Sequence, residues 1–157
     1  MADQSSVISA LEKALAGELA ANPQYSIHET AFRSVGILGL AAATKDRGED
    51  EHRHAQQAMQ RLLDLGAMPA PTLGQTAAAP GDPVTSIALD VEAELRAEAD
   101  WSAVAEAAEE AGDATTLHMA LAIRAEESEH LRELRGWQRQ IELTGSGNFL
   151  STHTPGA

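Results

Sequence analysis

Apolar residues recur every three or four positions along most of this chain, which is the spacing of one face of an α-helix. The first such stretch carries Ile8, Leu11 and Leu15, and later stretches continue the pattern as far as Ile141. Glycines and prolines separate the stretches. The pattern predicts an all-α protein with four long helices, over about residues 5–36, 40–66, 82–112 and 113–144, and a short fifth helix over 146–153.

The segment from Met68 to Gly81 has no helical period and contains three prolines. Its 14 residues can reach roughly 45–50 Å when extended, whereas a helix of about 28 residues is roughly 42 Å long. The segment can therefore cross a whole helical bundle, which predicts that the second and third helices run parallel. Asp82 followed by Pro83 is a typical helix start, and Asp113 is expected to cap the fourth long helix.

The composition fits a single domain spanning residues 1–157. Hydrophobic residues make up 43% of the chain and aromatic residues only 3%, so we expect a mostly aliphatic core. The formal net charge of −13 argues against a nucleic-acid-binding protein and favours attraction of cations. The chain has no cysteine, no N-terminal basic segment followed by an apolar one, and no apolar run of membrane-spanning length. These features predict a cytoplasmic protein without membrane or nucleic-acid partners.

Two of the predicted helix faces turn from apolar to polar at the same motif, Glu-x-x-His, whose spacing places both side chains on one side of a helix. The copies are Glu51 with His54 and Glu127 with His130. Each copy has another glutamate 33 residues upstream, Glu18 and Glu94 respectively, so a shift of 76 residues maps one set onto the other. Two such pairs and two single glutamates, from four helices, are the ligand set of a carboxylate-bridged dimetal site in a four-helix bundle.

A single Glu-x-x-His is more typical of a solvated helix face, because the chain has 24 acidic residues. We interpret most of them, Glu126 included, as such surface residues. The duplicated spacing on apolar faces favours a metal site instead. Burying an ionised carboxylate is costly without compensation, and two divalent cations would balance four of them. Oxygen and nitrogen ligands without sulfur suit iron or manganese, and zinc can also occupy such a site.

With these motifs the chain resembles bacterioferritin, a family of the ferritin-like superfamily. The resemblance covers nearly the whole length, including the crossover segment and the Asn148-Phe149-Leu150 tail. It implies a ferritin-like four-helix bundle with a long crossover between the second and third helices and a short C-terminal fifth helix. It also implies a ferroxidase that oxidises Fe²⁺ with O₂ or H₂O₂ at two iron ions per subunit. The resemblance further implies a homo-oligomeric cage of 24 subunits, built from two-fold dimers, that stores ferric mineral.

The resemblance also implies a role for each matching residue. Glu51 and Glu127 would bridge the two metals, with Glu18 and Glu94 as terminal carboxylates and His54 and His130 as terminal nitrogen ligands. Tyr25 has two interpretations: a hydrogen-bonding neighbour of the site with a part in catalysis, or a core tyrosine with a satisfied hydroxyl. Trp101 occupies the position of Tyr25 after the 76-residue shift, and we interpret it as core packing.

The chain departs from the family pattern at His52, where bacterioferritins carry a methionine that ligates haem across a two-fold dimer interface. Three interpretations compete: a solvent-exposed histidine, which we favour, a bis-histidine haem ligand, or an interface metal site. Pro23 is a second departure, and we expect it to kink the first helix. His28, His118 and His153 are interpreted as surface or structural residues.

Two other functions fit the same ligand pattern. One is a cage-free dimetal-carboxylate oxidase or peroxidase of the rubrerythrin type, because one ligand set serves several chemistries. The other is a non-catalytic helical bundle that buffers metal.

Overall fold

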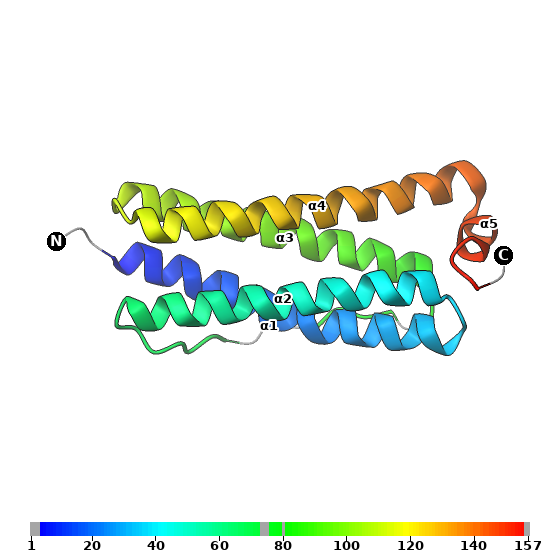
Figure 1. The fold of residues 1–157 in the computed structure, drawn as a ribbon, viewed down its shortest axis with the longest axis horizontal. Coiled ribbons are helices and arrows are strands. Elements are labelled where there is room, and N and C mark those ends of the chain that lie inside the picture. Colours follow the sequence, from blue (N-terminus) through cyan, green and yellow to red (C-terminus); the bar gives the residue numbers. More distant parts are fainter. Residues whose placement is uncertain (1–3, 73–75, 80, 156–157) are drawn as a thin grey trace.

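The computed structural model describes residues 4–72, 76–79 and 81–155, and no strand occurs among them. The helices are α1 (Ser5–Ser34), α2 (Leu38–Asp64), α3 (Pro83–Glu110), α4 (Ala114–Thr144) and the short α5 (Ser146–Ser151). The all-α fold class predicted from the sequence is confirmed, as is the four-helix bundle with a short C-terminal helix (Figure 1).

The helix ends follow from local chemistry. The Asp82 side chain accepts a hydrogen bond from the backbone N–H of Val84, and Pro83 opens α3, so this helix start is as predicted. The Asp113 side chain caps α4 in the same way. The first helix was predicted to reach residue 36, but α1 ends at Ser34, because Gly36 adopts a φ of 83° and turns the chain. Pro23 does not end α1, which runs through it.

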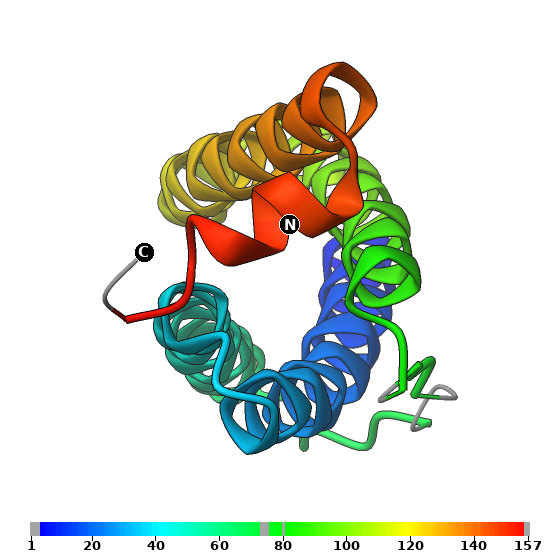
Figure 2. The same cartoon turned by 90° about the vertical axis from the view of Figure 1, so that its right-hand side faces the viewer.

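The bundle consists of two helical hairpins, α1 with α2 and α3 with α4, joined by the crossover (Figure 1). The crossover runs along the bundle, so α2 and α3 point the same way, as predicted. Viewed from the end, the helices lie in the order α1, α2, α4, α3 around the bundle, and α5 crosses that end (Figure 2). The contact between α2 and α4 is much sparser than the contacts between α1 and α2, α3 and α4, or α1 and α3.

His28 fixes one point of the crossover to α1. Its Nε2 accepts a hydrogen bond from the backbone N–H of Ala79 at 3.2 Å, so the ring proton is on Nδ1, which donates to Asp90 Oδ1 at 2.9 Å. Gln24 donates to the same Asp90 oxygen at 2.8 Å, and Ser86 donates to the carbonyl oxygen of Ala79 at 2.7 Å. His28 therefore has the structural role predicted for it.

Two apolar clusters fill the two halves of the bundle and leave its middle polar. One includes Leu11, Leu62 and Ile123, and the other includes Leu40 and Leu134. A fully buried leucine or isoleucine stabilises the fold by about 1.5–3 kcal/mol. Buried glutamates occupy the section between the clusters: Glu18, Glu51, Glu94 and Glu127. The apolar clusters therefore position a polar centre halfway along the four helices.

The tail closes one end of the bundle. Phe149 of α5 is buried against Trp137, and the carbonyl oxygen of His153 accepts a hydrogen bond from the backbone N–H of Gly39 at 2.9 Å. A Cβ atom at Gly39 would lie 3.3 Å from His153, so this close approach favours glycine. Gly39 thus lies inside α2, which begins at Leu38, two residues before the predicted start at about residue 40.

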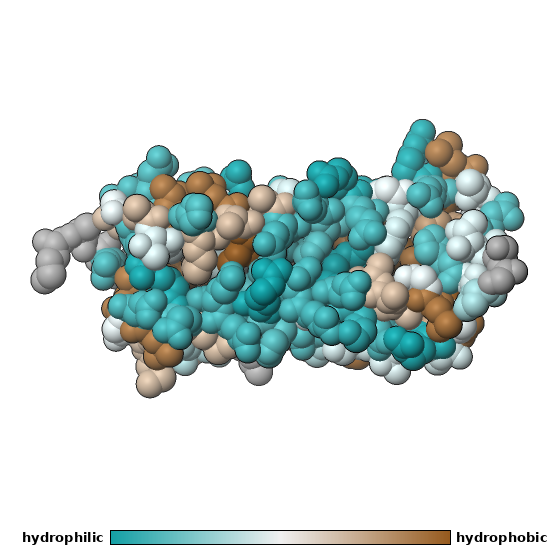
Figure 3. All heavy atoms as spheres, in the orientation of Figure 1, coloured by the Kyte–Doolittle hydropathy of each residue, from teal (hydrophilic) through white to brown (hydrophobic). Residues whose placement is uncertain are grey.

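The face formed by α2 and α4 is hydrophilic across its middle, and hydrophobic side chains gather toward its two ends (Figure 3). Within the part of the chain that the structure describes, no helix is both long enough and apolar enough to cross a lipid bilayer.

Candidate metal centre

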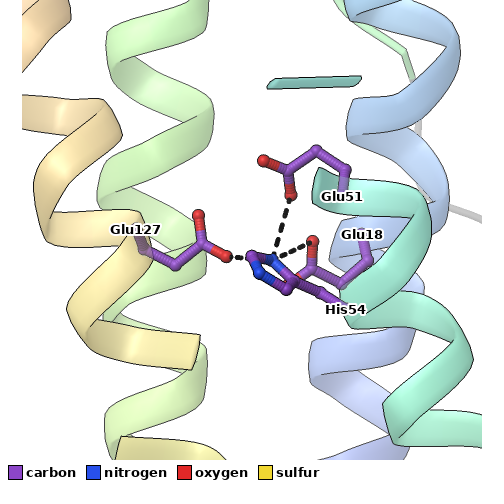
Figure 4. A group of neighbouring side chains, drawn as sticks. All are labelled: Glu18, Glu51, His54 and Glu127. Carbon is purple, nitrogen blue, oxygen red and sulfur yellow. Dashed lines mark ion pairs between the residues drawn. The ribbon is translucent and has the colours of Figure 1, made fainter. Parts of the chain in front are cut away.

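Four helices bring all six predicted ligand residues together in the polar middle of the bundle. Side-chain atoms of Glu18, Glu51, His54 and Glu127 lie within 4.8 Å of one another, and so do atoms of Glu51, Glu94, Glu127 and His130. Glu51 and Glu127 belong to both groups. Figure 4 shows the first group, in which glutamates from α1, α2 and α4 surround the His54 ring. We refer to this cluster of six residues, a candidate site for two metal ions, as the dimetal centre.

The atoms that converge in the dimetal centre have no hydrogen-bond partners. Among the buried side-chain atoms without one are eight from the six ligand residues: Glu18 Oε2, both carboxylate oxygens of Glu51, His54 Nδ1, Glu94 Oε2, both carboxylate oxygens of Glu127, and His130 Nδ1. His54 Nδ1 lies 2.6 Å from Glu127 Oε1 without the alignment of a hydrogen bond. Leaving a buried polar group unpaired costs about 1–3 kcal/mol. Metal binding would remove that cost.

The free atoms are distributed unequally among the four glutamates. Glu18 and Glu94 each offer one free oxygen, as a terminal ligand would, whereas Glu51 and Glu127 each offer two, as bridging ligands would. Shared between two ions, the eight atoms provide four donors to each. The donor set contains oxygen and nitrogen only, which suits iron, manganese or zinc.

Without metal, protons must supply the missing positive charge. Burial raises the pKa of Glu94 to about 7, and burial together with the neighbouring Glu18 raises the pKa of Glu51 well above its usual value. Burial disfavours the charged form of His130, but the carboxylates of Glu127, Glu51 and Glu94 outweigh it and raise its pKa to about 12. The metal-free centre therefore holds protons at neutral pH, and cations must displace them.

Each candidate ligand histidine is held from outside the centre by a carboxylate. His54 Nε2 donates to Glu126 Oε2 at 2.9 Å, and His130 Nε2 donates to Asp50 Oδ2 at 3.2 Å. Since an ionised carboxylate can only accept, each Nε2 carries a proton, and a neutral imidazole held in this way would direct the Nδ1 lone pair at a metal in the centre. Our interpretation of Glu126 as a solvated surface residue was wrong. The 76-residue shift maps Asp50 onto Glu126 and was the signal that we missed.

The two terminal glutamates are also held from outside, by aromatic side chains. The Tyr25 hydroxyl donates to Glu94 Oε1, and the Trp101 Nε1–H donates to Glu18 Oε1. Burial, followed by the charge of Glu94, raises the pKa of Tyr25 well above its usual value, so it stays a donor. Tyr25 therefore lies beside the centre with a satisfied hydroxyl. Trp101 packs in the core as predicted, but core packing alone is an incomplete account of it.

His52 does not take part in either metal group. It is exposed and lines a groove of about 370 Å³ between α1 and α2. The same groove is lined by the charged side chains of Glu29, Lys45 and Glu49. All three interpretations of His52 share this exposed position in the single chain.

Comparisons with known proteins agree with this geometry. The family model Ferritin, described as a ferritin-like domain, matches residues 8–144. The chain belongs to the ferritin family. It is similar to the bacterial ferritin of Neisseria meningitidis serogroup B, with 29% identity over 153 residues that cover 97% of this chain and 99% of that protein. It is also similar to the bacterial ferritin of Synechocystis, with 35% identity over 69 residues that cover 44% of each protein.

We expect the metal-free ferritin-like chain to lose stability as the pH rises from about 5 to 8. The pKa of Glu94 is raised from its usual 4.5 to about 7, so its ionisation lowers the free energy of unfolding as the pH rises between these two values. Protonated His130 stabilises the folded state below its usual pKa of 6.5, and this contribution declines as the pH rises toward about 12. Zn²⁺ would replace both protons, so the difference in Tm between zinc-loaded and metal-free protein should widen by at least about 2–4 °C. Thermal unfolding across this pH range measures it, and a constant or narrowing difference would contradict the expectation.

Replacing Trp101 by phenylalanine should weaken one metal position more than the other. The change removes the N–H that holds Glu18, so we expect roughly 10–100-fold weaker Co²⁺ binding at the position served by Glu18 and His54. Tyr25→Phe should weaken the position served by Glu94 and His130 instead. Isothermal titration with Co²⁺ measures both, with Trp137→Phe as the control for a truncated core tryptophan. Equal losses at both positions in either variant would contradict this assignment.

Proposed function

We propose that this chain is a ferroxidase that binds two Fe²⁺ ions in the dimetal centre and oxidises them to Fe³⁺. The observation that carries the proposal is the set of eight unpaired donor atoms from four helices, with a carboxylate charge that two divalent ions would balance. Membership of the ferritin family supports iron as the metal. The metal ligands would be Glu18, Glu51, His54, Glu94, Glu127 and His130.

In this reaction each Fe²⁺ gives up one electron. With O₂ as oxidant, two electrons and two protons yield H₂O₂; with H₂O₂ as oxidant, two electrons and two protons yield two waters. The chain would hold both ions at short range through Glu51 and Glu127, so that one oxidant molecule meets two reductants. A groove of about 410 Å³ between α1 and α3 has Glu18 in its lining and offers a route for ions from outside.

We further propose that the subunits form a 24-subunit homo-oligomeric cage from two-fold dimers in the cytoplasm, in which ferric mineral is stored. Relatives named bacterial ferritin match almost the full length of the chain, which supports this assembly. Our proposal assigns no haem, because His52 stands where bacterioferritins carry the methionine that ligates it.

Removing a bridging or a nitrogen ligand should abolish rapid iron oxidation. We expect Glu51→Ala and His130→Ala each to lower the initial rate by at least about 100-fold, because the paired ions can no longer form. Stopped-flow absorbance of Fe³⁺ formation after mixing anaerobic Fe²⁺-loaded protein with O₂ measures the rate. Glu92→Ala and His118→Ala are matched controls, since both residues are exposed and belong to neither metal group. Wild-type rates in either ligand variant would refute the ferroxidase, and a wild-type chain that binds iron without turnover would favour the metal-buffering function.

The assembly is tested by the mass in solution. With 16.5 kDa per chain, a closed shell of 24 copies should give a mass on the order of 400 kDa by light scattering during size-exclusion chromatography. A monomer or dimer would remove the storage cavity. It would leave the dimetal centre intact and favour the cage-free oxidase or peroxidase.

A further inference from the structure

A single guanidinium group joins the two carboxylates that hold the candidate ligand histidines. Arg53 Nη2 lies 2.6 Å from Asp50 Oδ1 and 2.8 Å from Glu126 Oε2. Asp50 accepts from His130, and Glu126 accepts from His54. Arg53, on α2, is therefore linked indirectly to both histidines of the dimetal centre. Asp50 provides the link to His130, and Glu126 provides the link to His54.

We propose that Arg53 is a positioning residue for both metal ions of the dimetal centre. The inference rests on the proposed function of this centre. Arg53 touches neither ion; it holds the two carboxylates, and the carboxylates hold the outer nitrogens of the two imidazoles. Partners of this kind orient a metal-bound histidine and fix its protonated nitrogen, and losing one commonly weakens metal binding roughly 10–100-fold.

The two carboxylates need such a partner, because neither is held by burial. The side chains of Asp50 and Glu126 are 37% and 41% exposed. A half-exposed carboxylate on a helix normally moves among several rotamers and is well solvated. Arg53 bonds to both at once, which keeps their acceptor oxygens directed at the histidines.

The contacts on the two sides differ. Glu126 uses the same oxygen for Arg53 and for His54, whereas Asp50 binds Arg53 with Oδ1 and His130 with Oδ2. The 76-residue shift maps Arg53 onto Glu129, which instead pairs with Arg132 on the surface. The two halves of the repeat therefore share one arginine rather than having one each.

Arg53 also lies where the bundle is least closed. Its contact with Glu126 spans α2 and α4, the neighbouring helices with the sparsest contact, on the face whose middle is hydrophilic (Figure 3). His130, the one ligand residue that is not fully buried, is 13% exposed. The bridge therefore holds the centre at its most open side.

The proposal is tested by measuring Co²⁺ binding to the intact chain. Calorimetric titration gives the affinity, and the visible absorption bands of bound Co²⁺ are recorded on the same samples. For Arg53→Gln we expect affinity at both positions to fall roughly 10-fold or more, with altered absorption bands. Asp50→Asn should affect chiefly the ion at His130, and Glu126→Gln chiefly the ion at His54. Arg53→Lys, which keeps a cation able to meet two carboxylates, should fall between wild type and Arg53→Gln.

Arg61→Gln is the matched control, because Arg61 also joins α2 to α4, through Asp113 at 2.8 Å, but lies away from the centre. It should destabilise the fold without changing Co²⁺ affinity or absorption. Loss of binding in Arg61→Gln equal to that in Arg53→Gln would overturn the proposal in favour of a general effect on the α2–α4 contact. Wild-type Co²⁺ binding by Arg53→Gln would overturn it as well, while leaving the ferroxidase in place. A wild-type chain that binds no Co²⁺ would instead overturn the dimetal centre, and this inference with it.

Discussion

Four buried carboxylates in one short section of a helical bundle are the constraint on which the rest of this structure depends. Ionised together in a dry interior they would repel one another and lack solvent, so their burial requires cations. The apolar clusters on either side supply the stability that such a section cannot provide. The hairpins and the crossover ensure that each of the four helices contributes one of the glutamates.

In this charged section, the polar atoms that face outward have hydrogen-bond partners, and those that face inward have none. Tyr25 and Trp101 each occupy one oxygen of a terminal glutamate, and Asp50 and Glu126 occupy the outer nitrogens of the histidines. What remains free is the inward set of oxygens and nitrogens. A centre arranged in this way needs little rearrangement to accept metal, because its ligands are oriented beforehand by groups that do not bind it.

Periodicity and repetition in the sequence were sufficient to predict the four long helices and the parallel direction of the two helices that the crossover joins. They were also sufficient to predict the six residues that meet in the centre. It was insufficient where the direction of one side chain decides the role. A tryptophan on an apolar stripe packs in the core whether or not its N–H reaches a carboxylate, and Trp101 does both. Glu126, half exposed beside a ligand, looks like any surface acid until its contact with His54 is seen. The second helix was predicted to begin at about residue 40, whereas α2 already includes Gly39, where the close approach of the tail favours a residue without a side chain.

The 76-residue repeat relates α1 and α2 to α3 and α4, and with them the two metal positions. In an assembly of two identical hairpin chains, symmetry would force the two ions into identical surroundings. A single chain is free of that restriction. Here a phenol holds Glu94 where an indole holds Glu18, and Arg53 has no counterpart in the other half of the repeat. The two proposed metal positions are therefore chemically inequivalent. Ions bound there need not bind in random order, and they need not give up their electrons at the same potential.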